Sequence, residues 1–221
     1  MPTQVLQAME QVLWGCNAMC NRGYVLGTAG NISSRVTDED LFVITPTSMP
    51  YEDLKADDLV VVDLQGNVVQ GHNKPSIEVS MHRIIFEKRP EVQAIVHTHS
   101  KFATAVGSLY GVKSVPALDV EGVLYLGGDL AVAPFAPPGS SELAANVVQA
   151  LGATAGVIME NHGAVGVGTT MKIAMIASDN VERMCEMYIA VLAAGKYKAL
   201  PEDYYRESVE KSLKLRNVVR Y

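Results

Sequence analysis

Two histidines separated by a single residue are the clearest sign of chemistry in this 221-residue sequence. His97 and His99 follow the apolar run at residues 94–96, which predicts a β-strand. Side chains alternate across a strand, so both imidazoles would point to the same side and could share a divalent metal ion. The same pattern is expected where a strand simply ends in polar residues. The pair alone leaves both interpretations open.

A third histidine, His162, follows another apolar run at residues 156–159. Functional side chains gather at strand ends in open α/β sheets. Three neutral imidazoles that leave one coordination position open are typical of a catalytic zinc site. The sequence predicts such a site only if the two strand ends meet in space.

Glu78 is an acidic residue in the first turn of a predicted helix, which Pro75 and Ser76 would open with Ser76 as the N-cap. The helix dipole favours an ionised carboxylate at this position. Most glutamates placed in this way are ordinary surface residues, so position alone does not single it out. His82 lies one helical turn later on the same face, and we expect a structural role for it rather than one in orienting the carboxylate.

Three loops rich in glycine and hydroxyl residues lie at residues 27–31, 45–48 and 75–76. Loops of this kind expose backbone N–H groups and can bind a phosphate without cationic side chains. Ordinary turns use the same residues, because Gly, Pro, Asn and Ser favour turn conformations. Each loop taken singly is better explained as a turn.

Helices and strands alternate along the rest of the chain without a strict βαβ rhythm. Apolar periodicity predicts helices at residues 3–22, 101–109, 141–151 and 170–194, and strands at 32–36, 41–44, 59–62, 68–69, 94–97, 131–133, 156–159 and 164–167. The long helix at 170–194 is expected to bury Ile173, Ile176, Ala177, Val181, Met184, Tyr188 and Val191. We expect a single domain over residues 1–221, with a helical tail that begins near Pro201 and ends at residues 218–221.

Composition excludes several partners. The formal charge is −6 and no cluster of basic residues occurs, so nucleic acid is not an expected partner. No apolar run is long enough for a membrane span, and the first residues lack the basic start of a signal peptide. Cys16, Cys20 and Cys185 are expected to be core thiols in a reducing compartment. The sequence therefore predicts a cytoplasmic protein with a small-molecule substrate.

Five short motifs combine these separate features. GTAGNIS, ITPTS, KPSIE, VHTHS and ENHG begin at positions 27, 44, 74, 96 and 160. In this order they resemble the class II aldolase/adducin-head family, over most of the chain up to about residue 194. The resemblance implies a three-layer α/β/α sandwich around a central, mainly antiparallel mixed sheet. It also implies a homotetramer with active sites between neighbouring subunits.

The resemblance assigns roles to individual residues. It implies that a divalent metal ion, expected to be Zn²⁺ with Mn²⁺ or another ion as alternatives, is held by His97, His99, His162 and Glu78. Glu78 would also act as the acid/base. The positions expected to bind a substrate phosphate are Gly30, Asn31, Thr47, Ser48, Ser76 and Ile77.

The reaction implied is an aldol cleavage. A fuculose-phosphate-like ketose 1-phosphate would yield dihydroxyacetone phosphate and an aldehyde, through an enediolate that the metal stabilises. The family commonly has Thr-Gly or Ser-Gly where this chain has Thr47-Ser48, and Ser-Ser-Glu where it has Ser76-Ile77-Glu78. These differences leave a decarboxylase of a keto or hydroxy-aromatic acid as the main alternative. A dehydratase, an epimerase and a non-catalytic adducin-like module are further ones.

A catalytic tyrosine is also implied by the resemblance, since the aldolases of the family bring one from a neighbouring subunit. Residues 117–128 contain no clear match to it. Tyr125, Tyr204, Tyr205 and Tyr221 are candidates between which the sequence does not decide.

Overall fold

The central sheet has nine strands in the order β4-β3-β2-β1-β5-β9-β8-β7-β6 in a computed structural model that describes residues 2–217. Every neighbouring pair is antiparallel except β7 and β8, which are parallel. The strands are β1 (Asn31–Arg35), β2 (Leu41–Ile44), β3 (Val60–Asp63), β4 (Val68–Gln70), β5 (Ala94–Thr98), β6 (Ser114–Val115), β7 (Leu130–Ala133), β8 (Gly156–Met159) and β9 (Gly163–Gly168).

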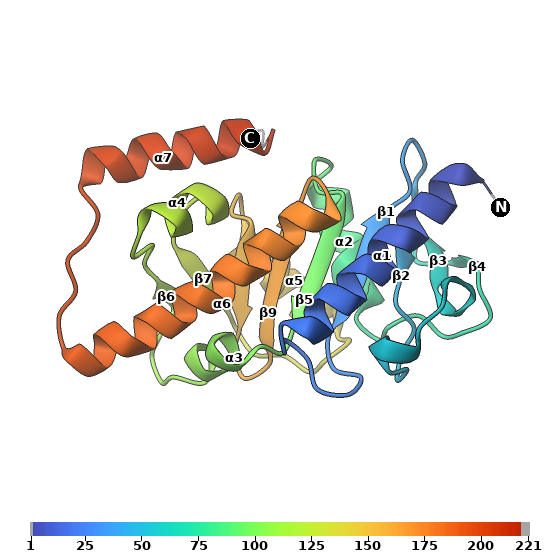
Figure 1. Cartoon of the computed structure of the whole chain (residues 1–221), viewed down its shortest axis with the longest axis horizontal. Helices are drawn as coiled ribbons and strands as arrows, with labels where there is room; N and C mark the ends of the chain where they lie inside the picture. Colours follow the sequence, from blue (N-terminus) through green and yellow to red (C-terminus); the bar gives the residue numbers. More distant parts are fainter. Residues whose placement is uncertain (1, 218–221) are drawn as a thin grey trace.

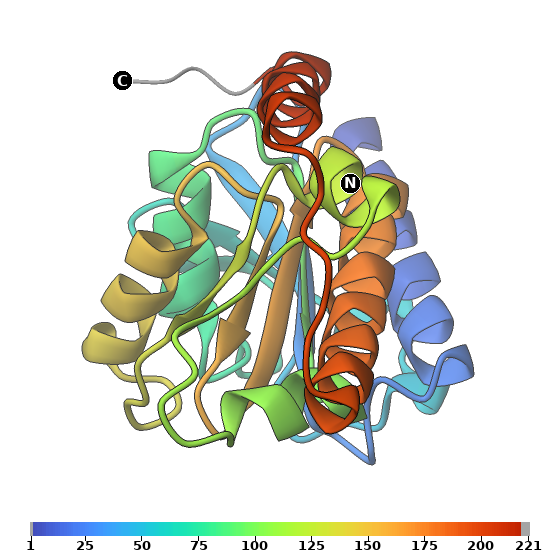
Figure 2. The ribbon, with the colours of Figure 1, turned by 90° about the vertical axis from the view of Figure 1, so that its left-hand side faces the viewer.

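Helices cover both faces of this sheet, as Figures 1 and 2 show. One face carries α1 and α6, which pack on the strands around β1, β5 and β9, and the other carries α2 and α5. The helices are α1 (Thr3–Asn21), α2 (Val79–Lys88), α3 (Lys101–Gly107), α4 (Val120–Leu126), α5 (Ser141–Leu151), α6 (Met171–Ala194) and α7 (Glu202–Leu215), with short 3-10 turns η1 (Tyr51–Asp53) and η2 (Ala56–Asp58). The expected three-layer sandwich with a mainly antiparallel mixed sheet is confirmed.

The expected start of α2 is wrong. Ser76 does not cap this helix, which begins at Val79 with Glu78 in the N-cap position. The reason is pairing with a distant loop: the Ser76 N–H donates to the Thr45 carbonyl at 3.0 Å, and the Thr47 N–H donates to the Lys74 carbonyl at 3.0 Å. Ser76 is therefore tied to this loop, and residues 77–78 form a turn, in which the Glu78 N–H donates to the Ser76 hydroxyl at 3.3 Å, before the helix begins.

Residues 117–128, for which the sequence predicted no element, contain α4. Asp119 caps this helix by accepting a hydrogen bond from the Gly122 N–H at 2.8 Å. The tail helix α7 packs against α4, and the Tyr205 hydroxyl hydrogen-bonds to Asp129 beside it. Residues 218–221, where the tail was expected to end, lie outside the described part of the chain.

The buried stripe of α6 also differs from the expectation. Ile173 is 37% exposed, whereas the small residues Ala174 and Ser178 are buried against β9. β9 presents Gly166 and Gly168 to this part of the helix, and a Cβ at Gly168 would lie 2.3 Å from the Ala174 nitrogen. The helix α6 and the strand β9 therefore approach too closely for a large side chain between them, so Ala174 and Ser178, rather than Ile173, face the strand.

Two of the three cysteines fit the expected core role, whereas Cys20 is only partly buried. Cys16 and Cys185 are buried and all three thiols are free. Burial raises the pKa of both buried thiols, so they remain protonated at neutral pH. None of the helices within residues 2–217 is long and apolar enough to cross a bilayer.

The close contact between α6 and β9 can be tested with Gly168→Ala. The added methyl group would meet helix backbone, which cannot rotate away, so we expect the free energy of unfolding to fall by about 1–3 kcal/mol. Chemical denaturation measures this change. Gly111→Ala is the control: no atom lies within 4 Å of its Cβ, and only its positive φ adds a cost of about 1–2 kcal/mol. A Gly168→Ala protein as stable as the wild type would contradict the close-contact explanation.

Candidate metal centre

The register of β5 against its two neighbours places three imidazoles in one cluster. His97 lies in β5, His99 follows it directly, and His162 lies in the turn between β8 and β9. Asn161 makes that turn tight by adopting φ +55, a left-handed conformation that asparagine tolerates well. All three pairs of ring centroids are 4.9 Å apart. The structure thus brings together the three histidines that the sequence singled out.

The Nε2 atoms of these rings point towards one another. The Nε2 atoms of His97 and His99 are 3.1 Å apart, and one nitrogen from each of the three rings falls within 4.8 Å of the others. The other ring nitrogen of His97, Nδ1, is 3.0 Å from the Ala164 carbonyl, which can only accept a hydrogen bond. Nδ1 therefore carries a proton. Burial lowers the pKa of His97, but the Glu78 carboxylate beside Nε2 raises it above its usual value overall, and a cation at the site would take the place of the Nε2 proton and bind the lone pair of that nitrogen.

Glu78 completes the cluster from the start of α2. Its Oε2 is 3.1 Å from His97 Nε2, and its Oε1 is 3.6 Å from His162 Nε2. The side chain is only 4% exposed, and Oε1 has no hydrogen-bond partner among the described residues. A buried carboxylate oxygen surrounded by ring nitrogens is costly to leave unpaired, so these four residues fit a divalent cation.

The electrostatics of the cluster agree with this fit. Burial and the neighbouring imidazoles lower the pKa of His99 to about 3, and burial with His97 lowers that of His162 to about 4. Both rings are therefore neutral at pH 7 and can donate a lone pair. Burial alone would raise the pKa of Glu78, but the charge and hydrogen bond of His97, with the Asn31 amide, hold it well below its usual range. Glu78 is ionised at neutral pH.

The loops expected to bind phosphate lie beside this cluster. Pro46 and Pro75 form an isolated bridge that joins the loop of Thr47 and Ser48 to the loop that leads into Glu78. Ser48 has φ +59, the left-handed conformation that glycine adopts most easily. Ser48 therefore has a backbone conformation that a glycine at this position could also adopt. Ile77 is 60% exposed, whereas Ser76 is buried.

Gly30 and Asn31 approach the cluster from β1. A Cβ at Gly30 would lie 2.5 Å from the His97 carbonyl, and its φ is +77, so only glycine suits this position. The Tyr51 hydroxyl donates a hydrogen bond to the Gly30 carbonyl and holds the loop in place. The Asn31 side-chain amide is already hydrogen-bonded to Glu78 and faces His82.

The backbone of His99 is supported by residues that the sequence analysis missed. Its N–H donates to the Tyr24 carbonyl at 2.9 Å. Glu182 of α6 accepts hydrogen bonds from the Ser100 hydroxyl at 2.6 Å and from the backbone N–H groups of Phe102 and Ala103 at 2.9 Å each. Because Glu182 lies about eighty residues from its partners, no local pattern could have revealed it.

The candidate tyrosines are spread over other parts of the chain. Tyr125 on α4 is 45% exposed and Tyr204 on α7 is 42% exposed. Tyr205 is hydrogen-bonded to Asp129, and Tyr221 lies outside the described residues.

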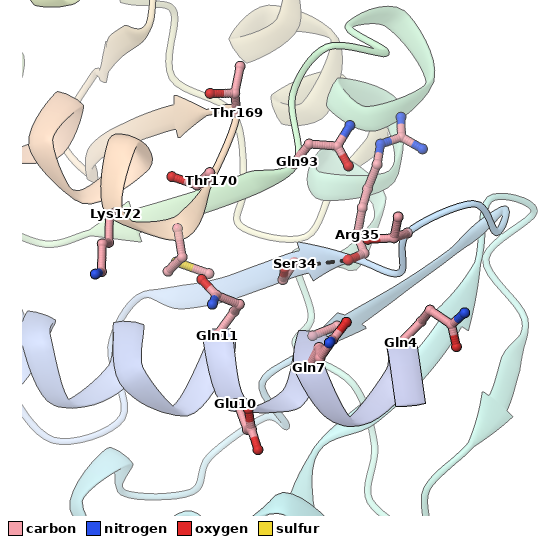
Figure 3. Close-up of a pocket in the computed structure, with 13 residues that line it drawn as sticks. Gln4, Gln7, Glu10, Gln11, Ser34, Arg35, Gln93, Thr169, Thr170 and Lys172 are labelled. Atoms are coloured by element: carbon pink, nitrogen blue, oxygen red, sulfur yellow. Dashed lines mark hydrogen bonds between the residues drawn. The ribbon is translucent and has the colours of Figure 1, made fainter. Parts of the chain in front are cut away.

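A separate polar pocket lies at the opposite end of β1 and β5, with a volume of about 540 Å³. Amide and hydroxyl side chains from α1, β1 and the start of α6 line it, as Figure 3 shows for Gln7, Ser34 and Thr170. The guanidinium of Arg35 is directed away to the Phe86 ring. None of the residues that line this pocket belongs to the histidine cluster.

The fold and this cluster define a three-layer α/β/α protein with a buried His₃–Glu centre that is suited to a divalent cation. Residues 10–189 match the family described as the class II aldolase and adducin N-terminal domain, and the chain belongs to this family. It is accordingly an enzyme of the lyase class.

Individual relatives are similar over most of their length. The chain is 31% identical to a 5-deoxy-D-ribulose 1-phosphate aldolase of Bacillus thuringiensis serovar kurstaki, with 88% of this chain and 90% of the relative covered. A solved L-fuculose 1-phosphate aldolase superposes with a TM-score of 0.87 at 29% identity, covering 93% of this chain and 95% of the other. The structure of YgbL of Klebsiella pneumoniae, described as an aldolase/epimerase/decarboxylase, superposes with a TM-score of 0.83 at 30% identity, covering 92% of this chain and 98% of the other.

Metal binding at the cluster can be tested without an activity assay. We expect the wild-type protein to bind about one zinc ion per chain and to gain about 2.7 kcal/mol of stability at a hundredfold excess over the dissociation constant. His162→Ala should lose both effects, because it removes one of three converging nitrogens. Elemental analysis and thermal unfolding with and without a chelator measure them.

The matched control is His72→Ala, since His72 is exposed in a loop and is not part of the cluster. It should bind zinc like the wild type. Zinc binding that survives His162→Ala unchanged would contradict the assignment.

Proposed function

We propose that this enzyme is a metal-dependent aldolase that cleaves a ketose 1-phosphate into dihydroxyacetone phosphate and an aldehyde. The observation that carries the proposal is the carboxylate of Glu78, buried in contact with the rings of His97 and His162. The relatives named as 5-deoxy-D-ribulose 1-phosphate and L-fuculose 1-phosphate aldolases support the substrate class.

The metal site of this proposal consists of His97, His99 and His162, with Glu78 as a further ligand before substrate binds. We assign zinc to it, because three neutral imidazoles with an open position are its usual catalytic ligands. When bound, the ion supplies Lewis-acid chemistry that polarises a carbonyl group and stabilises negative charge on its oxygen.

Glu78 is the acid/base of the reaction. In the direction of condensation, its ionised carboxylate removes a proton from the carbon of dihydroxyacetone phosphate that will form the new bond. In the direction of cleavage, Glu78 takes the proton of the C4 hydroxyl as that group becomes the aldehyde carbonyl, the C3–C4 bond breaks with its electron pair staying on the dihydroxyacetone phosphate half, and Glu78 then gives the proton to C3. Burial keeps water away from the carboxylate, so the proton goes to and from the substrate.

Phosphate binding is assigned to the loops that meet beside Glu78. Gly30, Ser48 and Ile77 contribute backbone N–H groups. Thr47 and Ser76, whose N–H groups are already hydrogen-bonded, contribute hydroxyls, and Asn31 lies at the edge of the same group. The left-handed backbone at Ser48 supports this assignment, since exposed N–H groups in such turns form anion-binding concavities.

The remaining properties follow the family resemblance. The chain acts as one domain over residues 1–221 with its helical tail from about residue 201, in a cytoplasmic homotetramer with active sites between subunits. Exposed apolar side chains such as Tyr110 and Phe135 support association between copies. Light scattering measures the molar mass in solution. The reaction would belong to carbohydrate metabolism.

A decarboxylase is the second candidate, because Ile77 presents an exposed apolar side chain where the family commonly has a hydroxyl. That change favours a substrate without phosphate at this position. The two reactions differ in product: decarboxylation of a keto or hydroxy-aromatic acid releases carbon dioxide, and aldol cleavage does not.

The test of the proposal is a cleavage assay on zinc-loaded enzyme with a panel of ketose 1-phosphates. We expect dihydroxyacetone phosphate to appear with at least one of them, and a coupled reduction of that product measures its rate. No product from any member of the panel would contradict the aldolase proposal. Release of carbon dioxide from a keto acid would support the alternative.

Glu78→Gln tests the acid/base role. The amide keeps the shape of the side chain but cannot take a proton, so we expect kcat to fall by about 10²–10⁴-fold. At saturating zinc the metal content should remain near that of the wild type, because the three histidines still bind the ion, although the loss of one ligand weakens the affinity. Glu87→Gln, on the exposed face of α2, is the control and should keep full activity. An unchanged kcat in Glu78→Gln would remove Glu78 from this role.

A further inference from the structure

Three buried polar side chains lie behind Glu78 and continue from it as one hydrogen-bonded chain. The Asn31 amide nitrogen donates to Glu78 Oε2 at 2.8 Å, and the Asn31 carbonyl oxygen is 2.5 Å from His82 Nε2. His82 Nδ1 is 2.6 Å from the Ser33 hydroxyl. Ser33 and His82 are fully buried, and Asn31 is 4% exposed. The sequence analysis expected a purely structural role for His82, yet its partners lead directly to the carboxylate.

Only one arrangement of protons satisfies every member of this chain. The Asn31 NH₂ group is directed to Glu78 Oε2 and can only donate a hydrogen bond there. Its carbonyl oxygen then faces His82, whose Nε2 must carry a proton to donate to it. Burial lowers the pKa of His82 to about 3, so the ring is neutral and its Nδ1 accepts from the Ser33 hydroxyl. Each bond therefore fixes the direction of the next.

The chain distinguishes the two oxygens of Glu78. Oε2 accepts from Asn31 and lies against His97 Nε2, whereas Oε1 has no hydrogen-bond partner within residues 2–217 and is directed towards His162. A carboxylate without such an anchor could rotate and exchange its two oxygens. Buried polar groups are costly to place in a core unless every one is paired, and apolar side chains could fill the same space. The arrangement therefore points to the orientation of Glu78 as its purpose.

We propose that His82 and Asn31 are positioning residues for proton transfer, which hold Glu78 through Oε2 so that Oε1 exchanges the proton with the substrate. This inference rests on the proposed function, because Glu78 is the acid/base there. Ser33 donates to Nδ1 of His82 and is the far end of the same hydrogen-bonded chain.

Two variants of His82 test the proposal. His82→Leu removes the donor to Asn31, and we expect kcat at saturating zinc to fall by about 10–100-fold, as is usual when a partner of a metal-site residue is lost. KM should stay within about twofold, because the substrate contacts are untouched. His82→Gln places an amide N–H near the position of Nε2 and should restore kcat to within about threefold of the wild type.

Proton transfer can be followed without bond cleavage. Exchange of deuterium into dihydroxyacetone phosphate alone, measured by NMR, reports on Glu78, and in His82→Leu it should slow by the same factor as kcat. Ile85→Ala is the matched control, since Ile85 is buried on the same helix but is not part of the hydrogen-bonded chain of Asn31, His82 and Ser33. It should lower thermal stability while kcat per folded enzyme stays unchanged.

The outcomes separate this inference from the proposed function. If the wild type cleaves a ketose 1-phosphate but His82→Leu retains its kcat and exchange rate, or if His82→Gln is no better than His82→Leu, the positioning role is overturned. If the wild type is inactive on every ketose 1-phosphate, the proposed function fails. The positioning of Glu78 by His82 is then tested by measuring the zinc affinity of the variants. Because His82 anchors Glu78, we expect zinc to bind about 10–100-fold more weakly in His82→Leu and with near wild-type affinity in His82→Gln. Equal zinc affinities in the wild type and His82→Leu would overturn the positioning role.

Discussion

A buried, ionised carboxylate is the constraint on which the rest of this structure depends. Glu78 lies against the imidazoles of His97 and His162, and a charge in such surroundings is costly unless other groups pair with it. Asn31 provides one donor to Oε2, the oxygen that also contacts His97, and leaves Oε1 facing His162. The protein thus holds a negative charge in its interior and keeps one side of it available for a cation and for chemistry.

The strands around β5 make this arrangement possible. β1 on one side places Asn31 opposite His97, and β9 on the other brings the Ala164 carbonyl to His97 Nδ1. A slip of one residue in either ladder would turn His97 to the other face of the sheet and separate it from Glu78. The contact of α6 with the glycines of β9 fixes that register, and Glu182 of the same helix holds the segment after His99. The site is therefore supported from elements far apart in the sequence.

Much of the fold and part of the site could be predicted from local patterns. The alternation of side chains in a strand predicted that His97 and His99 share one side, and apolar periodicity located most helices and strands within a few residues. Predictions failed where a distant segment decided the local structure. Thr45 holds Ser76 by a hydrogen bond and delays α2, and β9 selects Ala174 rather than Ile173 as the buried face of α6. His82 looked structural because its partner Asn31 is 51 residues away.

By itself, the sequence determined the element types, the same-side placement of His97 and His99, and an ordered set of motifs that indicates the class II aldolase family. These depend on short-range periodicity and on residue identity. Only the tertiary structure decided that His162 and Glu78 meet the other two histidines, which nitrogen of His97 faces the cluster, and which oxygen of Glu78 is anchored. Such properties depend on strand register and on hydrogen bonds between distant residues, because a side chain's protonation and direction are set by the atoms packed around it.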